Sequence, residues 1–194
     1  MAFDPLPVKL EGFHVRLEPL TLDHAAALFA IGQDPSIWQW LTRPPLQSLE
    51  DTRTWLGKVL EHYDEIAFAI IDRASGAVAG TTRYMDIRRE DRGLEIGGTW
   101  LGVDYMRTAI NTECKYLLMK HAFETLGAAR VQLKTDLRNE RSQSAIERIG
   151  AKREGVLRRH KLTRGGLIRD SVFYSVIDKE WPDVKKRLEE MIHR

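Results

Sequence analysis

The sequence predicts an α+β protein in which helices cover both faces of a mixed central β-sheet. Two observations lead to this fold class. Segments with the alternating pattern of strands occur throughout the chain, and segments with the apolar spacing of helices lie between them. The order is strand, two helices, three strands, helix, strand, helix, two strands and a final helix. With 194 residues, of which 43% are hydrophobic, the chain can bury a core, and we expect a single domain over residues 1–194.

The N-terminal part of the chain supplies one strand and two helices. Residues His14 to Leu20 alternate apolar and polar side chains, which indicates the first strand. A helix is expected over roughly Leu22 to Ile31, and Ser48 to His62 again repeats apolar residues at helical spacing. An aromatic loop that contains Trp38 and Trp40 separates the two helices.

Three strands follow. Ile66 to Asp72 and Val78 to Asp86 form a predicted hairpin around the turn at Ala74-Ser75-Gly76. The third strand, Leu94 to Val103, is interrupted by Gly97-Gly98. Paired glycines inside a strand indicate a bulge, or a place where another backbone comes close.

The C-terminal part alternates helices and strands. A helix that Gly127 ends comes first, then a cleanly alternating strand and a short helix that starts after Asn139. A hairpin and an amphipathic helix complete the chain. The expected ranges are Asn111 to Leu126, Arg130 to Asp136, Asn139 to Ile149, Glu154 to Leu162 and Leu167 to Ile177 around a turn at Arg164-Gly165-Gly166, and Glu180 to His193.

The charge balance and the cysteine count exclude several classes of protein. Lys and Arg number 30 against 28 Asp and Glu, and a net charge of only +2 argues against a dedicated nucleic-acid or membrane-surface protein. With one cysteine, Cys114, no intramolecular disulfide can form. No secretory signal or long apolar run is visible, so a cytoplasmic protein is expected.

Metal chemistry finds no support in the sequence. The six histidines show no metal-ligand spacing, and neither a His-Glu-x-x-His nor a Cys-x-x-Cys pattern occurs. The loop signature of nucleoside triphosphate enzymes is also missing. We therefore expect no metal cofactor.

Several short motifs occur in an order that is typical of one family. They are Leu94-Glu95-Ile96-Gly97, Thr99-Trp100-Leu101, Asn111-Thr112-Glu113, His121-Ala122-Phe123-Glu124, Asp136 with Asn139 and Ser142, Ile149-Gly150-Ala151, Glu154-Gly155 with Arg158, and Glu180-Trp181. By these motifs the chain resembles the GNAT superfamily over nearly its whole length, especially the ribosomal-protein-alanine N-acetyltransferase (RimJ/RimL-like) branch. The resemblance implies the GNAT fold with a bulged, splayed strand. It also implies transfer of an acetyl group from acetyl-CoA to a primary amine, on a protein N-terminus or a small molecule.

The loop from Val103 to Thr112 is the expected site for the CoA pyrophosphate, because a helix start presents free N–H groups to an anion. In the family this loop resembles Gln/Arg-x-x-Gly-x-Gly/Ala. The first position falls on Asp104, the central glycine on Arg107 and the last small residue on Ala109. A positive φ would disfavour a non-glycine residue at the central position. The Arg107 guanidinium could instead pair with a phosphate, and a solvated surface arginine is the alternative.

The resemblance implies that pantetheine lies along the bulged strand like an added strand. A main-chain N–H near Leu101 would then stabilise the oxyanion of the tetrahedral intermediate. An ordinary buried strand with two glycines is the alternative. The residues expected to contact CoA are Trp100, Leu101, Val103, Arg107, Thr108, Ala109, Asn111, Thr112 and Asn139.

Two residues are candidates for proton transfer. Glu95 lies on the central strand beside the glycines, where a carboxylate could accept the ammonium proton directly or through a water, although a solvent-facing glutamate is the alternative. Ser142 is the candidate donor to the departing thiolate. Asn139 is expected to cap the short helix, and the resemblance adds a hydrogen bond to pantetheine.

The acceptor side is less determined. Trp38 and Trp40 lie in a loop between prolines and lack the helical spacing that makes Trp55 a core residue, so we expect them to line the acceptor cleft. A polycationic antibiotic or polyamine would need an acidic cleft, which this aromatic loop does not provide. A CoA-binding or protein-interaction module without turnover is the alternative function. The acceptor and the oligomeric state, including a homodimer, stay open.

Overall fold

The computed structural model describes residues 3–163 and 166–193 and contains strands and helices in the predicted order. The strands are β1 (Leu10–Glu11), β2 (Val15–Pro19), β3 (Ile66–Asp72), β4 (Val78–Arg88), β5 (Gly93–Leu101), β6 (Arg130–Asp136), β7 (Lys152–Leu162) and β8 (Ile168–Ile177). The helices are α1 (Ala25–Ile31), α2 (Leu49–Leu60), α3 (Ala109–Lys120), α4 (Glu140–Arg148) and α5 (Trp181–Ile192). Short 3-10 turns lie at Leu22–His24, Pro35–Trp38 and Val103–Tyr105, and a π turn at His121–Thr125.

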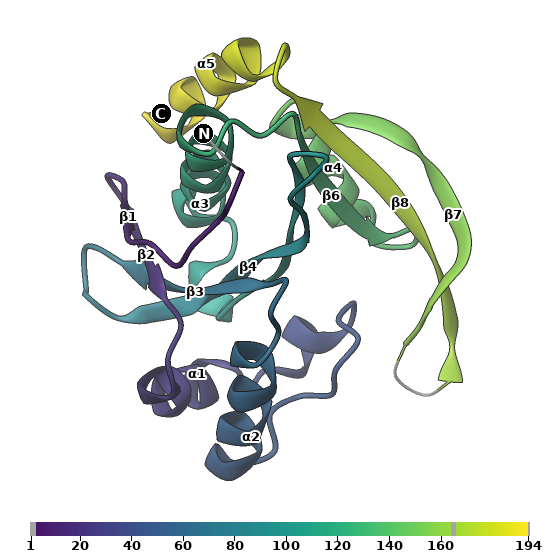
Figure 1. The fold of residues 1–194 in the computed structure, drawn as a ribbon. Coiled ribbons are helices and arrows are strands. Elements are labelled where there is room, and N and C mark those ends of the chain that lie inside the picture. The colour runs from purple at the N-terminus through teal and green to yellow at the C-terminus, as the bar shows by residue number, and fades with distance from the viewer. Residues whose placement is uncertain (1–2, 164–165, 194) are drawn as a thin grey trace.

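The strands form one sheet in the order β1-β2-β3-β4-β5-β6-β8-β7 (Figure 1). All neighbouring strands are antiparallel except β5 and β6, which are parallel. Because a parallel pair needs a crossover connection, the chain between β5 and β6 forms α3 and packs on one face of the sheet.

Helices cover both faces of the sheet, as predicted. Along β3, Phe68 and Ile70 belong to the core beneath α3 and α5, whereas the alternate residues Ala67 and Ala69 belong to a second core beneath α1 and α2. Successive side chains of a strand point to opposite faces, so the two cores lie on opposite sides of the sheet. Figure 1 shows α3 and α5 on one side of the strands and α1 and α2 on the other.

Some element boundaries differ from the predicted ones. Helix α3 begins at Ala109, two residues earlier than predicted, because the Thr108 hydroxyl caps it by accepting from the Ile110 N–H at 3.3 Å. The α-helix ends at Lys120, and its last part before Gly127 is the π turn. Strand β1 was not predicted, since two residues are too few to show a pattern. Of the turn predicted at Arg164-Gly165-Gly166, the first two residues lie outside the described residues.

The predicted bulge and splay are both confirmed at β5. The register between β4 and β5 shifts by one residue between Thr81 and Arg83, and Gly98 opposite this shift has a φ of 58°. On its other side β5 pairs with β6 at only three positions, the last of which is Glu95 with Gln132. Beyond Glu95 the two strands separate, which leaves one edge of β5 free of strand partners in the middle of the sheet.

Candidate active site

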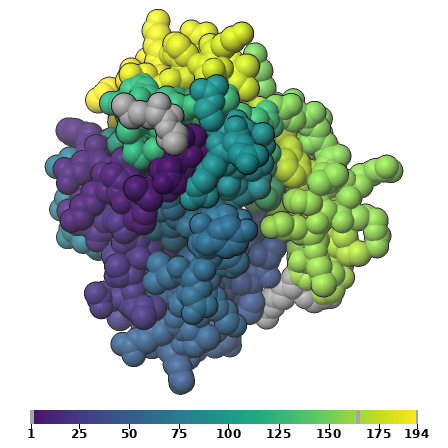
Figure 2. Space-filling view, in the orientation of Figure 1, coloured from purple at the N-terminus to yellow at the C-terminus, as the bar shows by residue number. Residues whose placement is uncertain are grey.

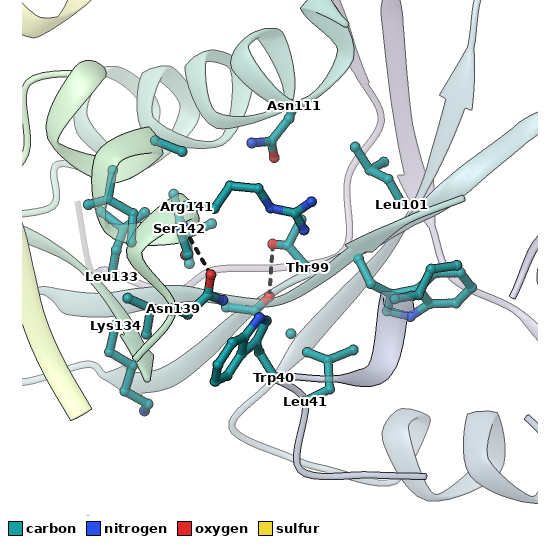
Figure 3. Close-up of a pocket in the computed structure, with 18 of the residues that line it drawn as sticks. Trp40, Leu41, Thr99, Leu101, Asn111, Leu133, Lys134, Asn139, Arg141 and Ser142 are labelled. Atoms are coloured by element: carbon teal, nitrogen blue, oxygen red, sulfur yellow. Dashed lines mark hydrogen bonds between the residues drawn. The ribbon is translucent and has the colours of Figure 1, made fainter. Parts of the chain in front are cut away.

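A cleft of about 570 Å³ opens where β5 and β6 separate (Figure 3). Its walls come from β5, β6, the start of α3, α4 and the loop before α2. The structure thus brings together residues that are far apart in the sequence. The predicted site residues that line the cleft are Trp38, Trp40, Glu95, Trp100, Leu101, Arg107, Thr108, Asn111, Asn139 and Ser142.

Three other predicted CoA contacts do not line this cleft within the described part of the chain: Val103, Ala109 and Thr112. Strand β5 ends at Leu101 and Val103 opens a turn, in which the Tyr105 N–H donates to the Gly102 carbonyl. Thr112 is buried, and its hydroxyl accepts a hydrogen bond from Arg148 at 3.2 Å. The side chain of Thr112 therefore supports α4 rather than facing the cleft.

The start of α3 keeps a glycine-like backbone without a glycine. Arg107 has a φ of 62°, in the left-handed region that L-residues usually avoid. Its exposed side chain and the start of the helix face the same cleft as Arg141 and Arg148 of α4. Free helix N–H groups and three guanidinium groups together suit an anionic ligand.

Helix α3 is fixed on its other side by Glu113. Its buried carboxylate accepts hydrogen bonds from the backbone N–H groups of Phe13, His14 and Val15, at 2.7, 2.6 and 2.7 Å. Gly12 lies so close that an added Cβ would fall 2.4 Å from the carboxylate carbon. The N-terminal segment and the start of α3 are thereby held together.

Glu95 is buried at the point where the sheet separates and has only 2% of its surface exposed. Its Oε2 accepts from Gln132 Nε2 at 3.0 Å and from Lys134 Nζ at 2.5 Å. An added Cβ on Gly97 would fall 2.7 Å from Oε1, so the glycine leaves room for this oxygen. The solvent-facing alternative for Glu95 is therefore wrong, and Lys134 is a site residue that sequence reasoning missed.

A second buried charge, Lys115 of α3, reaches the bulge of β5. Its Nζ donates to Thr99 Oγ1 at 2.9 Å, and that hydroxyl also bonds Thr82 Oγ1 at 2.8 Å. Burial lowers the pKa of Lys115, while the Glu95 carboxylate opposes this change. The lysine thus supplies a second cation near Glu95.

Asn139 has the capping role that was predicted. Its Oδ1 accepts from the Ser142 N–H at 3.1 Å and so begins α4 (Figure 3). Both side chains are half-buried and line the cleft. The contact of Asn139 with pantetheine and the acid role of Ser142 stay predictions.

The two tryptophans of the early loop differ from each other. Trp38 is buried, its Nε1 donates to the Gly32 carbonyl at 2.8 Å, and its ring lies 5.0 Å from that of Trp100. Trp38 therefore has a core role that its position in a loop did not predict, and it also lines the cleft. Trp40 is half-buried, and the Arg138 guanidinium lies 5.7 Å from its ring centroid, which joins the early loop to the loop before α4.

Two arginines that the sequence did not single out line the cleft beside Trp55. The guanidinium carbons of Arg43 and Arg83 lie 4.8 and 5.7 Å from the ring centroid of Trp55. Asp51 pairs with Arg43 at 3.1 Å, and Glu65 pairs with Arg83 at 3.0 Å. Burial lowers the pKa of Arg43, and the Asp51 hydrogen bond opposes it.

Within residues 3–163 and 166–193, no three His, Cys, Asp or Glu side chains gather closely enough to hold a metal ion. In the same residues, no helix combines the length and the apolar character that crossing a membrane requires.

Comparison with known proteins identifies the family. Residues 14–152 match the model of the acetyltransferase (GNAT) domain. A Bacillus subtilis (strain 168) protein named "Putative ribosomal N-acetyltransferase YdaF" is 32% identical over 110 residues, which are 57% of this chain and 59% of that protein.

Two solved structures show how far the similarity in fold extends. The crystal structure of a GCN5-related N-acetyltransferase from Brucella melitensis is 34% identical, with a TM-score of 0.93 over 97% of this chain and 86% of the other. Mycobacterium smegmatis RimJ in complex with CoA-disulfide is 19% identical, with a TM-score of 0.82 over 95% of both chains, and shows a shared fold. Since the family model covers most of the sequence, the chain belongs to the GNAT family of acetyltransferases.

Proposed function

We propose that this protein transfers the acetyl group of acetyl-CoA to a primary amine by direct attack. The separation of β5 and β6 after Glu95, next to the start of α3, is the observation that carries the proposal. The free edge of β5 can pair with an extended pantetheine as it would with another strand. The related fold of RimJ, whose structure contains CoA-disulfide, supports the same use of the cleft.

The CoA phosphates would bind at the start of α3. The left-handed backbone at Arg107 turns the chain into the helix, so that the first-turn N–H groups that the Thr108 cap does not use can bind an anion. Arg141 and Arg148 add charge on the α4 side of the cleft. This arrangement needs no glycine at position 107, which accounts for the departure from the family's loop pattern.

Glu95 would accept the ammonium proton of the acceptor. Its Oε2 is occupied by Gln132 and Lys134, whereas Oε1 lies beside Gly97 at the bulge. Once neutral, the amine nitrogen bonds to the thioester carbon, the carbon–sulfur bond breaks, and the nitrogen releases its second proton to solvent as the amide forms. The main-chain N–H of Leu101 would stabilise the oxyanion, and the thiolate takes a proton from Ser142 or from solvent.

We infer that the acceptor amine belongs to a protein N-terminus or a small molecule and that the reaction takes place in the cytoplasm. The name of the YdaF relative, which refers to ribosomal acetylation, supports a protein acceptor. That relative matches only part of the chain, so other amines belong in any test.

The test is release of the CoA thiol from acetyl-CoA in the presence of a panel of amines. Glu95→Gln should lower kcat/KM by about a hundredfold to ten-thousandfold, as is typical for loss of a general base. Acetyl-CoA binding, followed by thermal shift, should change little. Glu61→Gln, at an exposed position outside the cleft, is the control. Acetyl-CoA binding without thiol release for any amine would favour the module without turnover.

A further inference from the structure

Three N–H donors are buried near the Trp55 ring without a hydrogen-bond partner in the described part of the chain. They are Arg43 Nη1, Arg83 Nε and Trp100 Nε1. Buried donors are almost always paired, so each such group calls for an explanation. All three residues line the cleft proposed to bind the substrates.

The two guanidinium groups also lie close enough to affect each other's charge. Arg43 and Arg83 face the same Trp55 ring, and the charge of Arg83 adds to burial in lowering the pKa of Arg43. Each arginine has one carboxylate partner, Asp51 or Glu65, and neither acid lines the cleft. An anion placed in the cleft between the guanidinium groups would relieve their repulsion.

Other residues that line the cleft are also cationic. The β7–β8 hairpin, which forms one side of the molecule in Figure 2, contributes Lys161 and Arg169. Burial and the nearby Lys134 lower the pKa of Lys161. Glu95 is the only carboxylate among the described lining residues, and Lys134 already pairs with it. A polycationic acceptor would meet repulsion here.

We propose that Arg43, Arg83 and the Trp100 indole N–H bind a carboxylate of the acceptor, so that the preferred acceptors are amines that also carry a carboxylate. This inference rests on the proposed acetyl transfer at the same cleft. A guanidinium matches a carboxylate with two parallel hydrogen bonds, and the flanking Trp55 ring orients the fork. The arginines at the start of α3 and on α4 remain available for the CoA phosphates.

Two sources could supply such a carboxylate, and matched acceptors separate them. Free alanine against alaninamide tests an α-carboxylate. Amidated hexapeptides that begin Ala-Asp or Ala-Asn and are otherwise identical test the side chain of an acidic N-terminus. Rates are compared at equal concentrations of free amine, because the two members of a pair differ in amine basicity.

For at least one pair, kcat/KM should be about tenfold to a hundredfold higher for the carboxylate form, as expected for one or two charge-assisted hydrogen bonds. Arg43→Gln and Arg83→Gln should each reduce this ratio to less than about threefold, and Arg43→Lys should keep part of it. Arg53→Gln, at an exposed position of the same helix as Trp55, should keep the full ratio. Using a ratio removes any general loss of stability from the comparison.

Equal rates for both members of both pairs in the wild type would overturn the inference and leave acetyl transfer intact. If no acceptor of either kind releases thiol, the proposed transfer fails instead. The carboxylate site is then tested by tryptophan fluorescence with N-acetylalanine and N-acetylalaninamide. The site is supported if N-acetylalanine binds more tightly than N-acetylalaninamide and if Arg43→Gln abolishes this difference. Equal binding of the two probes to the wild type would refute it.

Discussion

Replacing Arg107 with glycine and, separately, with alanine would distinguish the backbone requirement at the start of α3 from the contribution of the guanidinium. Both variants lose the charge, but only glycine adopts the observed φ of 62° without steric cost. The left-handed region costs a non-glycine residue about 1 to 2 kcal/mol. Glycine loses about 0.5 to 1 kcal/mol of this advantage in folding free energy, because its backbone has more freedom in the unfolded chain. Arg107→Gly should therefore be more stable than Arg107→Ala by roughly 0.5 to 1 kcal/mol.

Thermal unfolding measures this difference, which corresponds to a gap of about 1 to 4 °C in Tm for a chain of this size. The structure offers a matched control in Arg92, an exposed residue between β4 and β5 with a φ of 49°. The Tm of Arg92→Gly should exceed that of Arg92→Ala by a similar margin. Neither change should affect acetyl-CoA binding.

Both Arg107 variants should bind acetyl-CoA about threefold to tenfold more weakly and acetyl-pantetheine as the wild type does, because only CoA carries the phosphates. Calorimetric titration with the two ligands checks this. The backbone argument is refuted if the glycine variant at position 92 is more stable than the alanine variant but the glycine variant at position 107 is not. Equal losses for both ligands would show that the guanidinium does not meet a phosphate.

Three further changes test other parts of the structure. Trp40→Ala should raise the acceptor KM with little change in Tm. Trp38→Ala removes a buried ring, so it should lower the free energy of unfolding in urea by about 3 to 5 kcal/mol. Equal effects of the two variants would contradict the assignment of Trp38 to the core and Trp40 to the cleft. Glu113→Gln should cost about 2 to 4 kcal/mol in the same assay, since an amide offers one acceptor oxygen to three N–H groups, and a loss below about 1 kcal/mol would argue against the clamp. Burial lowers the pKa of His121, so the folded state favours neutral imidazole and loses stability as pH falls below about 6.5. His121→Gln should therefore make Tm decline less steeply between about pH 7 and 5. An unchanged slope of Tm against pH would contradict this.

Much of the fold could be predicted because single strands and helices reveal their own period. The alternation of β6 matches its burial pattern, and Ser48 caps α2 by accepting from the Asp51 N–H. The glycines at 97 and 98 predicted the bulge, since few other reasons place two glycines inside a strand. The start of α3 was placed too late because the capping Thr108 follows a turn that has no sequence signature of its own.

The site could be predicted only where one residue carries the signal. Glu95 and Asn139 are such residues, and the structure places both in the cleft. The partner of Glu95 depends on the register that sets Glu95 against Gln132, which brings Lys134 within reach two residues later. The pair of Arg43 and Arg83 depends on how a loop packs across the sheet. A single sequence contains neither relation, and only the alternation of Gln132 and Lys134 on one face of β6 offered a hint.

The short contact between β5 and β6 also bears on how the molecule moves. Three residue pairs join the part of the sheet up to β5 to the part from β6 onward, so few strand contacts oppose movement of one part relative to the other. A ligand bound between β5 and β6 would contact both parts of the sheet and restrict their relative movement. Amide hydrogen exchange should therefore slow on acetyl-CoA binding along both strands that border the gap, including positions that touch no ligand atom. If exchange slowed on β5 alone, acetyl-CoA binding would not couple the two parts of the sheet.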